Sequence, residues 1–332
     1  MYEVLIGSSK PNHSALHQKL ESRHTRLSAK EFSLKVALAS TSVLALPTYR
    51  ALKDSSHQLP AIITKSEKES GRGLKIEESA FIASLEGEKV IRVEDQQGLV
   101  AALKEEKVDL VVTVSFGMLI KEEALKIPSL GWINLHFSLL PKYRGAAPVQ
   151  RAILAGEKKT GVSVFQLDKG MDTGALYTSK SIEMGEKSSG ELLDELAEIG
   201  SQELLRAIEM MEKGVAPTPQ MGEASLAPKI DSAETALDFK ASVDVVVRKV
   251  RAFAPKPGAW SKLRGGRVKI LEAERSNLPP KKPGEILSLN PLIISTSDDA
   301  ITIKTVQEAG KKVMHAQDWV RGARLAIGEF FE

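Results

Sequence analysis

Cysteine is absent from the 332-residue sequence. This excludes a disulfide scaffold, a thiol nucleophile, an iron–sulfur cluster and a Cys-ligated zinc. Aromatic residues make up only 5%, and no apolar run approaches the roughly 18 residues that a membrane span needs. Six scattered histidines are too few to suggest a metal site, so we expect no metal and no membrane partner. Hydrophobic residues at 42% and charged residues at 27% instead indicate a globular protein of about two domains.

The net charge of +3 is unevenly distributed. Residues 236–332 carry 17 Lys and Arg against 11 Asp and Glu, whereas residues 34–235 carry 24 against 29. An acidic front part followed by a basic back part favours a polyanionic partner for the latter. The alternative is that these charges are simply solvated.

The first 33 residues do not resemble a fold element. They are rich in Ser, His and Arg, show no period, and lack the apolar core of a secretory signal. Three glutamates weaken a mitochondrial targeting interpretation. We expect the natural chain to start near Leu34, with residues 1–33 either a disordered extension or the product of a start assigned too far upstream. The alternatives are a weak targeting peptide or an additional contact surface, and the intact mass of the native protein would test them.

Strand-like and helix-like segments alternate after Leu34. Strands are predicted at 34–39, 61–64, 90–93, 109–115, 132–137 and 161–167, and helices at 47–52, around 81–85, at 96–106 and at 190–211. This pattern predicts an α/β domain over 34–213, with a Rossmann-like, mostly parallel sheet whose ligands bind beyond the carboxyl ends of the strands.

A Pro-rich stretch at 214–235 follows and is typical of an interdomain linker. Beyond it, 243–253 predicts an amphipathic helix. Short strand-like runs separated by Gly, Pro, Asn and Asp predict a small β-barrel within a C-terminal domain over 236–332.

Candidate chemistry concentrates between Asn134 and Asp172. Asn134 and His136 are two residues apart on a predicted strand, so their side chains point to one side. The loop 138–148 follows at once, and the next strand ends in the turn DKGMDTG (168–174). No nucleophile elbow or phosphate-binding glycine loop competes with this set.

An amide, an imidazole and a carboxylate together suit formyl transfer between amines. The oxyanion that develops needs fixed donors, which an Asn amide and a protonated imidazole can supply. A nearby carboxylate can orient the imidazole and relay protons through water.

The segments NLHFSLLPKYRGAAPVQRAI (134–153) and MDTG (171–174) resemble the formyltransferases that use 10-formyltetrahydrofolate, most closely the bacterial branch that formylates methionyl-tRNA. The resemblance covers most of the chain after residue 34. It implies that Asn134, His136 and Asp172 are catalytic. It also implies transfer of the formyl group to the amino group of methionyl-initiator tRNA at translation initiation, by a monomer in the bacterial cytoplasm, with an organellar location as the alternative.

The resemblance also implies binding residues. The folate donor is expected to contact two segments and a closing turn, at Phe116, Gly117, Met118, Leu119, Ile120, Ser138, Leu139, Leu140, Pro141, Asp168 and Gly170. The tRNA is expected to contact the loop IITKSEKESGRGLK (62–75), the catalytic domain and the barrel, at Arg72, Lys75, Arg144, Arg264, Arg267, Lys269, Lys311 and Lys312.

Several positions depart from the family's usual pattern: Ser40-Thr41-Ser42 replaces GTP, Lys65-Ser66-Glu67 replaces Gln-Pro-Asp, and FGMLI (116–120) replaces YGQIL. None of them touches the three catalytic positions.

Two alternatives remain. Formyltransferases that act on glycinamide ribonucleotide or amino sugars, or that hydrolyse the folate, share the Asn, His and Asp. The GAAPVQRAI run (145–153) and the basic C-terminal domain favour the tRNA branch. A nucleic-acid-binding protein with an inactive transferase body is the other alternative, and the intact set of three residues argues against it.

Overall fold

The computed structural model describes residues 33–66, 79–85 and 87–332, and Leu34–Glu332 forms one compact unit. In its N-terminal part the elements are β1 (Val36–Ser40), the 3-10 turn η1 (Val43–Ala45), α2 (Leu46–Lys53), β2 (Ile62–Lys65), α3 (Ala80–Ala83), β3 (Val90–Val93), α4 (Gln96–Glu106), β4 (Leu110–Val114), α5 (Glu122–Leu125), β5 (Trp132–His136), β6 (Arg144–Gly145), α6 (Pro148–Ala155), β7 (Lys159–Gln166), β8 (Leu176–Glu183) and α7 (Ser189–Glu212).

The remaining elements are β9 (Leu226–Ala227), the 3-10 turn η2 (Ala233–Thr235), α8 (Val243–Phe253), β10 (Ala259–Leu263), β11 (Gly266–Ser276), β12 (Ile286–Leu289), β13 (Leu292–Ser295), β14 (Ala300–Glu308), β15 (Met314–His315) and α9 (Ala316–Ala323). The predicted strands and helices are present. The elements that were not predicted from the sequence include α5, α6, α9, β6, β8, β9, β10 and β15.

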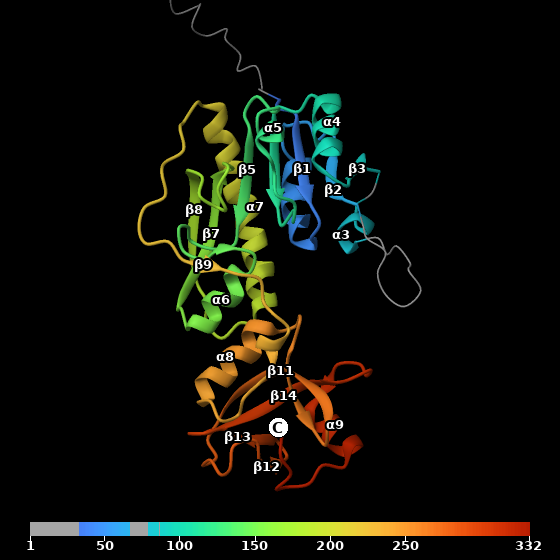
Figure 1. Ribbon diagram of the computed structural model, residues 1–332, viewed down its shortest axis with the longest axis vertical. Helices are drawn as coiled ribbons and strands as arrows, with labels where there is room; N and C mark the ends of the chain where they lie inside the picture. The colour runs from blue at the N-terminus through green and yellow to red at the C-terminus, as the bar shows by residue number, and fades with distance from the viewer. Residues whose placement is uncertain (1–32, 67–78, 86) are drawn as a thin grey trace, which may run out of the picture. The chain divides into compact units, whose positions relative to one another are not determined.

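A seven-stranded sheet organises the N-terminal part, in the order β3-β2-β1-β4-β5-β7-β8 (Figure 1). The first five strands are parallel, whereas β7 is antiparallel to β5 and β8 is antiparallel to β7. The mostly parallel sheet is therefore confirmed. The antiparallel β7 was not foreseen; it arises because the connection through α6 begins and ends at the same end of the sheet.

Helices pack on both faces of this sheet. On one face, Ile133 and Leu135 of β5 belong to a core that includes Leu196 and Leu204 of α7. On the other face, Trp132 packs in a second core with Leu99 and Leu103 of α4. A capping box of Ser188 and Glu191 fixes the start of the long helix α7.

The C-terminal part is an antiparallel sheet in the order β10-β11-β14-β13-β12, with β15 paired to β14. Residues after α9 close it: Phe331 bridges to Leu263, the last residue of β10, and Phe330 bridges to Glu285, just before β12. This closure gives the small barrel that the sequence predicts. Among the described helices, none is both long and apolar enough to cross a membrane.

Candidate active site

Asn134 and His136 lie near the carboxyl end of β5, where loops rather than helices contact the strand. Both side chains share the face of Trp132, whose indole N–H donates to the Ala124 carbonyl of α5 at 2.9 Å. Beyond Trp132, loops and a neighbouring strand contact this face of β5. The sequence prediction that Asn134 and His136 point to one side is therefore confirmed.

The amide of Asn134 is oriented by Thr113 on the adjacent strand β4. These residues are register partners, and the Thr113 hydroxyl donates to Asn134 Oδ1 at 2.7 Å. Because Oδ1 of Asn134 accepts this hydrogen bond, its Nδ2 group points away from Thr113. Thr113 was not among the predicted site residues, although a polar residue inside the apolar run DLVVTVS (109–115) was a usable signal.

His136 is 6% exposed and contacts two loops. Its Nε2–H donates to the Tyr143 carbonyl at 2.9 Å, and its Nδ1 lies 3.7 Å from Asp172 Oδ2. The ring also meets the edge of Phe165 on β7. Asn134, His136 and Asp172 are thus brought to one place, as the sequence interpretation requires.

Burial lowers the pKa of His136 below its usual 6.5, although the Asp172 carboxylate and the Tyr143 carbonyl oppose this shift. The lowered pKa favours the neutral ring, in which Nε2–H is donated to Tyr143 and Nδ1 carries no proton. In this state Nδ1 is a proton acceptor, and the amide of Asn134 is the available donor. The sequence interpretation of a protonated imidazole that donates to an oxyanion stays a prediction for the reacting complex.

Asp172 reaches His136 from an unexpected direction. Because β7 is antiparallel, the 168–174 turn starts at the end of the sheet opposite the carboxyl end of β5, and it folds back to His136. Asp172 has a positive φ of 53° and accepts the Gly145 N–H at 2.7 Å. Asp168 stabilises the turn by accepting from Gly170 N and the Thr173 hydroxyl.

Segment 116–120 lies on the side of the sheet that holds the 168–174 turn, because Lys169 of the turn pairs with Glu122 of α5 at 2.8 Å. Phe116 is buried, while Met118 and Ile120 pack partly on the α4 core. Leu119 is 78% exposed and Met171 of the turn is 58% exposed. Of the predicted folate wall, Leu119 is thus an exposed apolar side chain, and the turn adds the exposed side chain of Met171, which was not predicted.

The 138–141 segment is mostly internal. Ser138, Leu140 and Pro141 are buried, and the Leu140 N–H donates to Ser163 Oγ on β7. The Ser163 hydroxyl in turn donates to the Ser138 carbonyl. These hydrogen bonds attach the loop to the sheet. Because three of its four residues are buried, the segment can offer a ligand only a small part of its surface.

Predicted tRNA contacts of the barrel gather at one end of its sheet. Pairing of Val268 with Glu308 sets the turn before β11 beside the turn after β14, which groups Arg264, Arg267, Lys269, Lys311 and Lys312. Arg267 stacks on Trp260 at 3.7 Å, and Lys311 and Lys312 are exposed. Arg72 and Lys75 lie outside the described residues.

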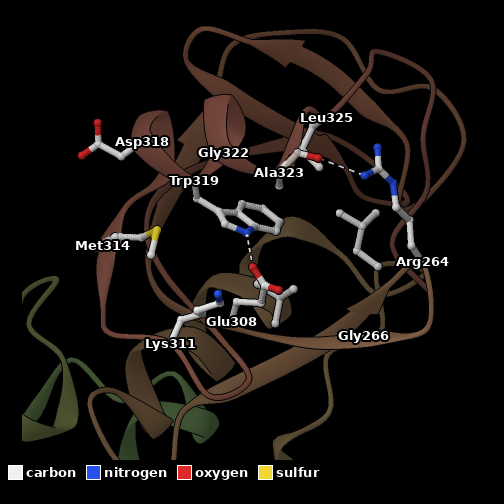
Figure 2. Close-up of a pocket in the computed structure, with 12 residues that line it drawn as sticks. Arg264, Gly266, Glu308, Lys311, Met314, Asp318, Trp319, Gly322, Ala323 and Leu325 are labelled. Atoms are coloured by element: carbon white, nitrogen blue, oxygen red, sulfur yellow. Dashed lines mark hydrogen bonds between the residues drawn. The ribbon is translucent and has the colours of Figure 1, made fainter.

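A surface pocket of about 550 Å³ adjoins this basic end (Figure 2). Arg264 and Lys311 both line it, and Trp319 donates to Glu308 inside it. The Arg264 guanidinium also pairs with Glu329 and donates to the Ala323 carbonyl. These bonds give Arg264 a structural role and leave it less available to a tRNA than Lys311.

The stretch predicted as a linker contacts the active site directly. Leu176 and Thr218 exchange backbone hydrogen bonds, and Arg144–Gly145 pairs with Leu226–Ala227 as strands β6 and β9. Arg144 donates to Gln220 rather than lying free for a tRNA. No local pattern signals these contacts, because Pro and small residues there indicate only a connection.

Two family profiles match this chain. The profile described as formyl transferase covers residues 34–208, and that of the formyl transferase C-terminal domain covers 229–324. The chain belongs to the formyl transferase family. The resemblance seen in the sequence is therefore confirmed, and the three predicted catalytic residues lie within the first matched range.

Individual relatives agree with this assignment. Methionyl-tRNA formyltransferase of Thermobifida fusca is 38% identical over 308 residues, which cover 90% of this chain and 99% of that protein. Among solved structures, HypX from Aquifex aeolicus, crystallised with tetrahydrofolic acid, has a TM-score of 0.68 at 22% identity, covering 89% of this chain and 48% of that one. Methionyl-tRNA formyltransferase from Clostridium thermocellum has a TM-score of 0.56 at 16% identity, over 74% of this chain and 94% of that one, which supports the shared fold.

Proposed function

We propose that this protein transfers the formyl group of 10-formyltetrahydrofolate to the amino group of methionyl-initiator tRNA. The observation that carries the proposal is the grouping of the Asn134 amide, the His136 ring and the Asp172 carboxylate. The sequence similarity to methionyl-tRNA formyltransferases, which extends over nearly the whole chain, supports methionyl-tRNA as the acceptor. We further propose that it acts as a monomer in the bacterial cytoplasm.

Asn134 supplies the donor for the transition state. Since Thr113 holds its Oδ1, the Nδ2 hydrogens are available for an oxygen that becomes negative as the amine attacks. A donor held in place before the reaction does not need to reorganise during it. Removing one such donor typically costs about 10²–10³ in rate.

His136 and Asp172 handle the proton. Nδ1 of the neutral ring can accept the proton that the attacking amine loses, directly or through one water. Asp172, 3.7 Å away, stabilises the imidazolium that results. His136 can then return the proton to the departing nitrogen.

The folate donor supplies an activated formyl group when it is bound. The exposed side chains of Leu119 and Met171 fit a flat ring system, because they leave apolar surface open beside the turn that carries Asp172. We propose that they hold the donor together with Phe116, Met118, Ile120 and the 138–141 segment.

The tRNA is proposed to bind the basic end of the barrel through Arg267, Lys269, Lys311 and Lys312. Their grouping by strand register supports this surface. Arg72 and Lys75 remain predictions for the acceptor end of the tRNA.

A formylation assay with purified protein, 10-formyltetrahydrofolate and charged initiator tRNA tests the proposal. The wild type should form N-formylmethionyl-tRNA, and Asn134→Ala should lower kcat by about 10²–10³. His136→Ala and Asp172→Ala should lose most turnover while donor binding persists. Folded variants that retain near-normal turnover would refute the catalytic assignment.

Alternative acceptors separate this function from its neighbours in the family. Glycinamide ribonucleotide and a nucleotide-linked amino sugar should not be formylated at comparable kcat/KM. A wild type that prefers either acceptor, or that binds tRNA without formylating it, would refute the proposed substrate.

A further inference from the structure

Gln220 makes four hydrogen bonds with residues around the candidate active site. Its Nε2 donates to the Asp172 carbonyl at 2.9 Å and to the Gly174 carbonyl at 2.8 Å. Its Oε1 accepts from Arg144 Nε at 3.2 Å and from Arg144 Nη2 at 2.6 Å. These contacts use the full donor and acceptor capacity of a Gln amide.

The turn that Gln220 holds is conformationally demanding. Asp172 has a φ of 53°, a left-handed conformation that costs energy for a residue with a side chain. Gly174 is packed so tightly that a Cβ there would lie 1.7 Å from the Gln166 carbonyl oxygen. The two bonds from Nε2 lie on either side of Thr173 and stabilise the turn in the conformation that brings Asp172 to His136.

The backbone near Gln220 is itself attached to the catalytic domain. Thr218 pairs with Leu176 at the start of β8, and Ser225 Oγ accepts the Tyr143 N–H at 2.9 Å. Both partners of His136 are therefore held from this segment: Tyr143 through Ser225, and Asp172 through Gln220. A side chain on a merely connecting linker would not need such contacts.

We propose that Gln220 is a positioning residue that sets the placement of Asp172 against His136, and that Thr218, Gln220 and Ser225 support the active site from a stretch that would otherwise only connect two domains. The proposal rests on the proposed catalytic role of Asp172 and deepens it. Gln220 contacts neither His136 nor Asn134 in the described hydrogen bonds, so it acts through the turn.

Two substitutions distinguish the role of the Nε2 donor of Gln220, which holds the turn, from that of the Oε1 acceptor, which binds Arg144. Gln220→Ala removes every bond, and we expect kcat to fall by about 10-fold to 100-fold, with the folate Kd within about 2-fold of wild type. Gln220→Glu keeps an acceptor for Arg144 but sets a carboxylate against two carbonyls, so it should be at least as impaired. If Gln220→Glu keeps the wild-type kcat, Gln220 serves only to anchor Arg144 and the proposal is wrong.

Met221→Ala is the matched control, because Met221 is adjacent and 82% exposed. It should leave kcat unchanged. If Gln220→Ala unfolds at the assay temperature, Gln220→Met preserves the length of the side chain and still removes the donors. Wild-type kcat in a folded Gln220→Met variant would overturn the proposal.

A double-mutant comparison identifies the route of the effect. In an Asp172→Asn background, Gln220→Ala should lower kcat by less than about 2-fold, because the carboxylate it positions is already absent. An undiminished loss in that background would show a general structural role and would contradict the proposal.

NMR titration of the His136 ring in the free protein provides a readout that needs no activity. Among the described residues, Asp172 is the charged side chain that acts on His136; Tyr143 meets the ring with its carbonyl and Phe165 with its edge. A displaced Asp172 should lower the pKa of His136 in Gln220→Ala. An unchanged pKa refutes the role of Gln220, whereas a wild type inactive on methionyl-tRNA refutes only the proposed function.

Discussion

The Thr113 hydroxyl decides which atoms of Asn134 are free to act. It is buried, and it donates to Oδ1 rather than leaving the orientation of the amide to the substrate. A single neutral hydrogen bond contributes about 1 kcal/mol, or about 5-fold in rate if it acts only on orientation.

Thr113→Val should therefore lower the single-turnover formylation rate by about 5-fold, because it keeps the shape and removes the hydroxyl. Thr113→Ser, which keeps the hydroxyl, should recover most of the rate. Equal rates in the wild type and the Val variant would show that Asn134 needs no partner.

The lowered pKa of His136 predicts a pH-dependent contribution to stability. Below the ordinary value of 6.5 an unfolded chain takes up a proton at this residue that the folded chain does not, so stability falls as pH decreases from about 7 toward the lower folded pKa. Above about pH 7 both states are neutral and the contribution is constant.

Chemical unfolding of the wild type and of His136→Gln at several pH values between about 5 and 8 measures this contribution. The difference between their unfolding free energies should shrink on acidification, with a slope of at most about 1.4 kcal/mol per pH unit. A difference that grows on acidification would contradict a lowered pKa. The same shift places the acid limb of kcat/KM below pH 6.5.

Among the elements, the short β6–β9 ladder links the active site to the segment after α7. Gly145 has a φ of 125°, donates to Asp172, and is so close to Ala227 that a Cβ would lie 2.7 Å from its carbonyl oxygen. Only glycine meets the conformational and the spatial requirement together.

Gly145→Ala should separate the ladder and lower the free energy of unfolding by about 2–4 kcal/mol, with a large loss of kcat. Gly185→Ala is the control, since Gly185 also has a positive φ, of 57°, but no atom lies within 4 Å of its added Cβ. It should cost about 1 kcal/mol. Equal effects in urea unfolding would show that crowding against Ala227 is unimportant.

For the whole molecule, the proposed tRNA-binding surface depends on the uneven distribution of charge between the N-terminal and C-terminal parts. The basic end of the barrel combines residues from two turns that are over 40 positions apart in the chain. Such a surface binds phosphates electrostatically, and its affinity falls with salt.

Lys311→Ala together with Lys312→Ala should raise the KM for charged tRNA and leave the folate Kd unchanged. The salt dependence of tRNA binding should become shallower by roughly one unit of slope for each phosphate that the variant no longer neutralises. Lys158→Ala together with Lys159→Ala, an adjacent and exposed pair in the catalytic domain, is the charge-matched control. A salt slope that is the same in the double variant and the wild type would remove these lysines from the interface.

Much of the architecture follows from local patterns in the sequence. Helices α4 and α8 coincide with the predicted 96–106 and 243–253 because their apolar spacing is clear and a capping Asp95 starts the former. Strand β8 (LYTSKSIE) was missed because it lies at the edge of the sheet. Its residues are either half-buried or exposed, so they show no regular apolar alternation. Residue-level resemblance singled out Asn134, His136 and Asp172, and the structure gathers them.

The sequence by itself determined the family, the two-part organisation and the identity of the three candidate catalytic residues, because these depend on short motifs and on hydrophobic periods. Only the tertiary structure decided the direction of β7, the burial that lowers the pKa of His136, and the contacts of Thr113 and Gln220. Gln220 stands 48 positions from Asp172, and strand direction and burial arise from packing between distant segments. No local pattern encodes such contacts, so the way Asp172 is held against His136 became evident only in the folded chain.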